Sequence, residues 1–198
     1  MKITILAPDA SGLVEWPTLS ANRKSVVTVG VFDGMHRGHQ AVIRRAVELA
    51  KADKAFSVVV MFDPRPGVVH AYAAAHDGQE PGDGFCDPMA LTSVDQRLRT
   101  LENLGVDHVL IVRYTLAFAT KSYRFFLGQM VGKLGMRTLV LGTDAAMGAN
   151  RAGDVKAIGV LAQATGVFEL EIVDDRGLLP ELRAASSRLG DALRSEER

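Results

Sequence analysis

Short runs of apolar, mostly β-branched residues alternate along the chain with segments of helical periodicity, and this alternation strongly constrains the fold. The run at 56–62, FSVVVMF, is almost uninterrupted, which is typical of a strand covered on both faces in a parallel sheet. We expect strands at 25–31, 56–62, 108–114, 138–142 and 168–173, and helices at 38–52, 93–104, 122–134 and 154–165. This order predicts an α/β fold in which a mainly parallel sheet of five to six strands is flanked by helices.

Composition limits the class of protein. The 198 residues are 47% hydrophobic and 23% charged, which fits a single globular domain with its own core. The 23 Lys and Arg balance 23 Asp and Glu, so no overall positive charge favours nucleic acid or an anionic membrane as a partner. The single cysteine, Cys86, cannot form an intrachain disulfide, and no export signal or membrane-spanning run is visible. We therefore expect a cytoplasmic protein.

Open parallel sheets bind ligands at the carboxyl ends of their strands, so we expect function in the loops that follow residues 31, 62, 114 and 142. Residues 63–90 are rich in Gly and Pro, and we expect them to form a long mobile loop that acts as a substrate lid. The segment 178–198 is polar and includes ASSR at 185–188.

Two histidines, His36 and His39, fall at the start of the first expected helix. A helix N-terminus favours anions, and Gly34 and Gly38 let a phosphate approach the backbone. Histidines at this spacing share one side of the first turn, where both can donate to one anion as its charge builds up. The pair is also compatible with half of a metal site or with solvated capping histidines. Neither G-x-x-x-x-G-K-[ST] nor G-x-G-x-x-G occurs, which argues against P-loop kinases and dinucleotide dehydrogenases.

The segment 26–40, VVTVGVFDGMHRGHQ, resembles the adenylyltransferase module of bacterial bifunctional riboflavin kinase/FAD synthetases, which belong to the H-x-G-H nucleotidyltransferase superfamily. The resemblance covers about residues 25–194 and includes MFDPRP at 61–66, LT at 91–92, LGVD at 104–107 and LGTD at 141–144, with Gly148, Arg151, Gly153 and Asp154. It implies a Rossmann-like nucleotidyltransferase fold for a single domain spanning residues 1–198. The family's riboflavin kinase domain would follow the module, so we do not expect phosphorylation of riboflavin.

The resemblance also implies an activity: transfer of AMP from ATP to FMN, which gives FAD and pyrophosphate, with Mg²⁺ accompanying ATP. His36 and His39 are implied as catalytic residues that stabilise charge on the triphosphate, and no metal-ligating side chain is implied. The implied nucleotide-binding residues are Gly30, Phe32, Asp33, Gly34, Gly38, Gly142, Asp144, Gly148, Arg151, Ser186, Ser187 and Arg188. The implied flavin-binding residues are Phe62, Pro64, Arg65 and Met147.

The chain departs from the family pattern where the acceptor and the leaving group are expected. Ala145, Ala146 and Met147 follow LGTD, where the family pattern G-x-D-F-x-F-G supplies aromatic rings, and this predicts weak flavin binding. Gly190 stands in place of the arginine of the family's phosphate segment, and Arg65 in place of the histidine of F-D-P-H-P. Two alternatives remain open: a nucleotidyltransferase that uses another phosphorylated acceptor or CTP, and a flavin- or nucleotide-binding protein without turnover.

Overall fold

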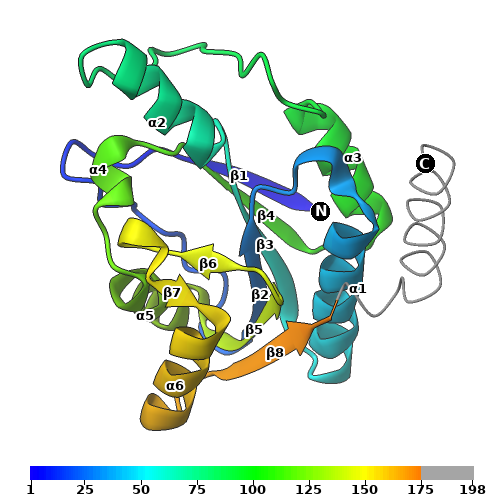
Figure 1. Cartoon of the computed structure of the whole chain (residues 1–198). Coiled ribbons are helices and arrows are strands. Elements are labelled where there is room, and N and C mark those ends of the chain that lie inside the picture. The colour runs from blue at the N-terminus through cyan, green and yellow to red at the C-terminus, as the bar shows by residue number, and fades with distance from the viewer. Residues whose placement is uncertain (175–198) are drawn as a thin grey trace, which may run out of the picture.

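The computed structural model describes residues 1–174, which form a six-stranded sheet with helices on both faces (Figure 1). The strand order is β1-β4-β3-β2-β5-β8, and every neighbouring pair is parallel, which confirms the expected fold class. The strands are β1 (Lys2–Leu6), β2 (Ser25–Gly30), β3 (Phe56–Phe62), β4 (His108–Val112), β5 (Met136–Gly142) and β8 (Glu169–Val173). The helices are α1 (Arg37–Ala52), α2 (Pro66–Ala75), α3 (Val94–Asn103), α4 (Leu116–Ala119), α5 (Tyr123–Leu134) and α6 (Val155–Thr165).

Four shorter elements lie at the carboxyl edge of the sheet. The turn η1 (Asp33–Met35) leads into α1, and η2 (Ala149–Arg151) lies between the two strands of a small antiparallel ribbon, β6 (Ala146–Met147) and β7 (Gly153–Asp154). From β2 the chain passes to β3 on one side, and from β4 it returns to β5 on the other. This reversal makes the carboxyl ends of β2 and β5 the switch point at which sheets of this kind bind ligands.

Both faces of the sheet are covered, which explains the uninterrupted apolar runs. Alternate residues of each strand point to opposite faces. One face packs Val58, Val60 and Leu110 against α5 and α6, and the other packs Val59 and Met61 against α1 and α3. Each of these side chains is at most 1% exposed, and full burial of such a side chain contributes about 1.5 to 3 kcal/mol.

The helix starts follow from local sequence. Ser93 and Gln96 form the expected capping box of α3: the Ser93 hydroxyl accepts from the Gln96 N–H, and the Gln96 side chain accepts from the Ser93 N–H. Ser122 and Asp154 cap α5 and α6 by a single hydrogen bond each, in which a side-chain oxygen accepts the backbone N–H three residues further on. These caps fix where each helix begins, and so where each carboxyl-edge loop ends.

Two expectations need correction. Residues 63–90 are not loop throughout, because α2 occupies Pro66–Ala75; proline suits the first turn of a helix, and an alanine-rich segment follows it. The strand β1 was not expected at all. It lies at the sheet edge with Ile3 45% and Ile5 77% exposed, and residues 7–24, which follow it, form no helix, so neither a buried run nor a following helix signals it.

Candidate active site

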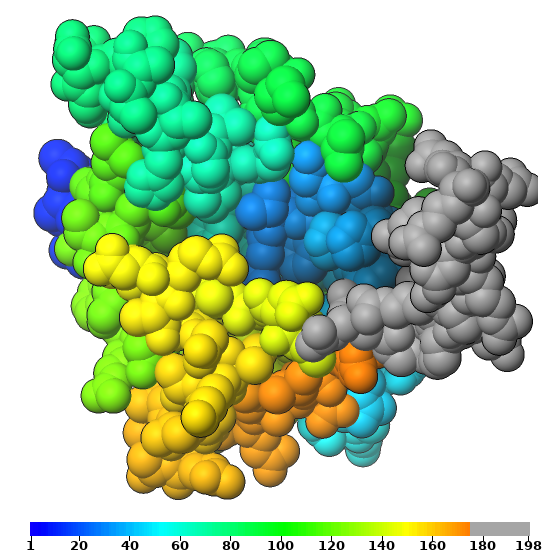
Figure 2. Space-filling view, viewed as in Figure 1, coloured from blue at the N-terminus to red at the C-terminus, as the bar shows by residue number. Residues whose placement is uncertain are grey.

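A cleft of about 530 Å³ lies at the carboxyl ends of β2 and β5. Gly30 and Gly142 contribute the strand ends, His36 and His39 contribute the start of α1, and Phe62 contributes the end of β3. Residues 144–148 and Arg151 line it from the β6–β7 ribbon. Figure 2 has the same view as Figure 1. It shows the blue atoms of residues near 30–45 between the cyan-to-green atoms of 63–90 and the yellow atoms of the ribbon. The cleft therefore occupies the predicted switch point.

The two histidines form a stacked pair. Their ring centroids lie 3.5 Å apart, with 22° between the planes. His36 is the N-cap of α1, where its Nδ1 accepts the backbone N–H of His39 at 3.2 Å. Because Nδ1 is an acceptor, the proton of the neutral His36 ring lies on Nε2. The capping geometry therefore leaves Nε2 as the donor that His36 offers to a ligand.

Phe32 packs against the His39 ring of this pair. It is 4% exposed, its backbone is left-handed with φ 55°, and its ring meets the His39 ring edge-on at 5.5 Å between centroids. A Cβ at Gly30 would come within 3.1 Å of the Phe32 ring, so the glycine allows the ring to lie across the strand end. The ring is thus held between the end of β2 and His39.

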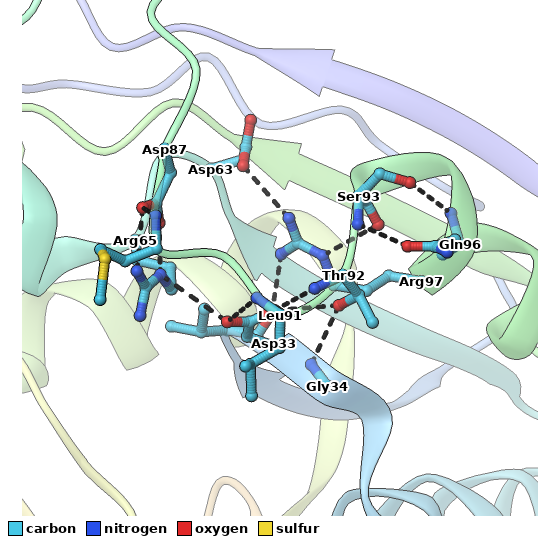
Figure 3. A network of polar contacts seen from close by, with 12 residues as sticks. Asp33, Gly34, Asp63, Arg65, Asp87, Leu91, Thr92, Ser93, Gln96 and Arg97 are labelled. Atoms are coloured by element: carbon cyan, nitrogen blue, oxygen red, sulfur yellow. Dashed lines mark hydrogen bonds and ion pairs between the residues drawn. The ribbon is translucent and has the colours of Figure 1, made fainter.

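Residues 91–92 clamp the loop that precedes α1 (Figure 3). The Asp33 carboxylate accepts the backbone N–H of Leu91 at 3.0 Å and both the N–H and the hydroxyl of Thr92 at 2.9 Å. The Thr92 hydroxyl also accepts the Gly34 N–H at 2.9 Å. Burial raises the pKa of Asp33, but the hydrogen bonds from Leu91 and Thr92 outweigh it, so the pKa lies below its usual value. Asp33 therefore acts as an acceptor that organises the loop.

Arg65 is held by acidic groups. It donates to both carboxylate oxygens of Asp87, one contact being 2.9 Å from Nη2 to Oδ1, and its Nε lies 3.8 Å from Asp33 (Figure 3). The guanidinium lowers the pKa of the Asp87 carboxyl. These contacts tie the segment that follows β3 to residues 87–92.

An aromatic wall, defined here as Phe62, Tyr114, Phe118 and Phe126, lines the same cleft as the histidines. The Phe62 ring lies 5.6 Å from the Phe118 ring and 6.0 Å from the Tyr114 ring. The Tyr114 hydroxyl is 2.9 Å from His70 Nε2, and burial raises its pKa. Such rings can receive a planar apolar group by stacking or by edge contact.

The comparison with protein families matches residues 18–186 to the FAD synthetase family. The chain belongs to this family. The bifunctional riboflavin kinase/FMN adenylyltransferase of Listeria monocytogenes is 31% identical over 160 residues, which are 81% of this chain and 46% of that protein. The protein of the same name from Escherichia coli strain K12 is 34% identical over 130 residues, which are 65% of this chain and 38% of that protein. The chain thus spans about half or less of the length of these relatives.

Solved structures support the fold. A crystal structure of a macrolide-efflux protein from Streptococcus pneumoniae superposes with a TM-score of 0.64 at 21% identity, covering 86% of this chain and 49% of that one. At this identity the likeness concerns the fold alone. Within residues 1–174, no helix has the length and apolar character needed to cross a membrane.

The structure brings together many of the site residues expected for a FAD synthetase. Those that line the cleft are Gly30, Phe32, His36, Gly38, His39, Phe62, Gly142, Asp144, Met147, Gly148 and Arg151. Asp33, Gly34, Pro64 and Arg65 are not among the lining residues, and the contacts of Asp33, Gly34 and Arg65 connect loops. Ser186, Ser187, Arg188 and Gly190 lie outside the described residues.

Sequence reasoning missed several residues of the cleft. Tyr114, Phe118 and Phe126 supply aromatic rings to the cleft that Ala145 and Ala146 also line. The sequence offered one signal for Tyr114 and Phe118: both follow β4, and ligands bind at the carboxyl ends of the strands in such sheets. Thr28 was also missed: it lines the cleft, and its buried hydroxyl has no hydrogen-bond partner within residues 1–174.

Proposed function

We propose that this FAD synthetase family member transfers the adenylyl group of ATP to FMN, giving FAD and pyrophosphate. The main support is the stacked pair His36–His39 at the start of α1, in a cleft that the four rings of the aromatic wall also line. An anion site and a surface for a planar ring thus share one cavity. The curated relatives carry FMN adenylyltransferase in their names, and they support the same activity for this chain.

The reaction needs no strong general base. A phosphate oxygen of FMN forms a bond to the α-phosphorus of ATP, and the bond from that phosphorus to the bridging oxygen of the β-phosphate breaks. Pyrophosphate leaves with the bonding electron pair. The attacking phosphate is already largely ionised at neutral pH, since its second pKa is about 6. Catalysis then consists of alignment and stabilisation of the charge that builds on the phosphate oxygens.

The start of α1 is suited to that task. His36 offers Nε2–H, and His39 lies stacked beside it on the same cleft wall. Gly38 lies in the first helical turn, where backbone N–H groups have no partner within the helix and the helix dipole is positive. We assign the triphosphate to these groups. One such preorganised donor contributes on the order of 3 kcal/mol to the transition state.

Mg²⁺ accompanies the nucleotide in this proposal. Within residues 1–174 no three His, Cys, Asp or Glu side chains are grouped so that they could hold a metal ion. A magnesium ion bound mainly to substrate phosphates and water, with one or two protein oxygens at most, is compatible with such a surface. The ion would neutralise phosphate charge while the histidines and the helix start orient the phosphates.

The remaining cleft residues divide between the two substrates. We assign the flavin ring to the aromatic wall, which includes Phe62, and to Met147, which packs against the core cluster that contains Phe126. Gly142, Asp144 and Arg151 lie at the end of β5 and on the ribbon, where we assign the nucleoside, with the Asp144 carboxylate as an acceptor for ribose hydroxyls. The contacts of Asp33 and Arg65 favour a role in shaping the loops.

Replacement of His39 tests the proposal. With ATP, Mg²⁺ and FMN, the wild-type chain is expected to release pyrophosphate and form FAD, measured by coupled assay and mass spectrometry. His39→Ala should lower kcat about a hundredfold or more while the Kd for ATP changes less. His76→Ala is the matched control, because His76 does not line the cleft and is expected to have no effect. An unchanged kcat in His39→Ala would refute the role of the pair.

The same assay distinguishes the alternatives for the acceptor. Ala145 and Ala146 leave one part of the cleft wall without rings, so other phosphate esters and CTP belong in the panel. Pyrophosphate release only with another acceptor or with CTP would identify a nucleotidyltransferase of different specificity. Tight binding of ATP and FMN without release would identify a binding protein.

A further inference from the structure

Arg97 is a charged residue of α3 that is buried almost completely. Only 2% of its side chain is exposed, and it contacts the loop between β2 and α1. Its Nη1 donates to the Val31 carbonyl at 3.0 Å. Its Nη2 donates to Asp63 Oδ1 at 3.2 Å, and Figure 3 shows this contact. A buried guanidinium is costly unless its donors are satisfied, so a site that keeps one depends on those contacts.

The two acceptors lie at functionally important positions. Val31 follows β2 and lines the cleft, and Asp63 follows β3, directly after Phe62 of the aromatic wall. One planar guanidinium therefore connects the ends of two central strands. The fork of donors on arginine makes such a bridge possible, whereas an ammonium group presents a single point charge.

The bridge continues into the histidine pair through consecutive contacts. The Val31 carbonyl belongs to the peptide that joins Val31 to Phe32, so a hydrogen bond to that oxygen holds the orientation of the peptide plane. Phe32 adopts a left-handed backbone with φ 55°, which is strained for a non-glycine residue and persists only where its surroundings enforce it. The Phe32 ring then meets His39, and His39 stacks on His36.

We propose that Arg97 is a positioning residue for the adenylyl transfer: by holding the Val31–Phe32 peptide, it sets the Phe32 ring that supports His39. This inference rests on the proposed function and adds a residue that does not line the cleft. It differs from a purely structural role in its consequences. A structural arginine would affect only the free energy of unfolding, whereas a positioning arginine also affects kcat of the folded enzyme.

The test compares Arg97→Lys and Arg97→Gln with Arg99→Lys. Arg99 lies on the same helix but is exposed, so it is a matched control. All variants are assayed well below their Tm, with folding checked by circular dichroism. We expect kcat with ATP and FMN to fall about tenfold to a hundredfold in both Arg97 variants, because small misplacements of catalytic groups have effects of this size. The KM and Kd values for ATP should change about twofold or less.

A second readout does not require turnover. The chain contains five histidines, and the His39 ring signals in an NMR spectrum can be assigned with the His39→Ala variant. In folded Arg97→Lys these signals should shift, while those of His76 stay in place, and Arg99→Lys should leave both unchanged. Wild-type kcat together with unshifted His39 signals in either folded Arg97 variant would overturn the proposal. Absence of product from the wild-type chain would refute the proposed function alone, since the NMR comparison would still decide the positioning role.

Discussion

Residues 31–34, which precede the histidine pair, are held by polar contacts from residues 91–97, whereas the β6–β7 ribbon, which also lines the cleft, is held by close packing of glycines against α5. Thr92 and Arg97 supply the polar contacts. Gly148 and Gly153 supply the packing: a Cβ at either position would come within 2.4 Å of Tyr123 atoms. The histidine side thus depends on hydrogen-bond donors and acceptors, and the ribbon side depends on the absence of side chains.

The largest effect is expected from Gly148→Ala on the ribbon side. Gly148 has φ 77° and ψ 178°, a region open essentially to glycine alone, and the added Cβ would lie 2.3 Å from the Tyr123 backbone nitrogen. The free energy of unfolding should fall by about 3 kcal/mol. Urea denaturation measures this loss.

Gly128→Ala is the control for that experiment, because Gly128 lies within α5 with no atom near its would-be Cβ. Alanine is the better helix former, so this change should stabilise the protein by about 0.5 to 1 kcal/mol. A Gly148→Ala protein as stable as the wild type would show that glycine packing does not hold the ribbon.

A smaller effect is expected from Thr92→Val on the histidine side. Valine has a similar shape but cannot donate to Asp33 or accept from Gly34. Loss of these two hydrogen bonds should reduce the free energy of unfolding by about 1 to 2 kcal/mol, again measured in urea. In the control Thr100→Val, the hydroxyl lost is an exposed one that bonds back to the Gln96 carbonyl of its own helix, and the change should stay within about 0.5 kcal/mol. Equal effects from the two variants would show that the hydrogen bonds of the Thr92 hydroxyl to Asp33 and Gly34 do not stabilise the fold.

The smallest effect concerns the pH dependence contributed by Asp33. Its pKa in the folded chain lies below the ordinary value, so the folded state binds the proton less readily than the unfolded state does. The stabilisation is therefore fully present above the unfolded pKa of about 4, and it is lost as the pH falls through the lower folded pKa. Urea titrations of wild type and Asp33→Asn should show an advantage for the wild type above that value, and the advantage should shrink at more acid pH. A difference that does not change with pH would exclude the charged form of Asp33 as its source.

The parts of the fold that sequence predicted are those governed by local pattern. The buried runs at β2 and β3, the capping box at Ser93 and the position of the histidines at a helix start all follow from periodicity and capping chemistry. The missed parts lack such a signal. β1 is a short edge strand with exposed isoleucines, and α2 lies within a stretch whose Gly and Pro content predicts loop.

The sequence by itself determined that a parallel α/β sheet forms and that two histidines begin its first crossover helix, because strand periodicity and helix capping act over a few neighbouring residues. Only the tertiary structure decided which distant residues meet. Thr92 donates to Asp33, 59 residues away in the sequence, and Arg97 donates to Val31, 66 residues away. Phe118 packs near Phe62 in the aromatic wall. Parallel crossovers collect the carboxyl ends of separate strands at one edge, and the contacts made there depend on how the helices pack, which no local pattern specifies.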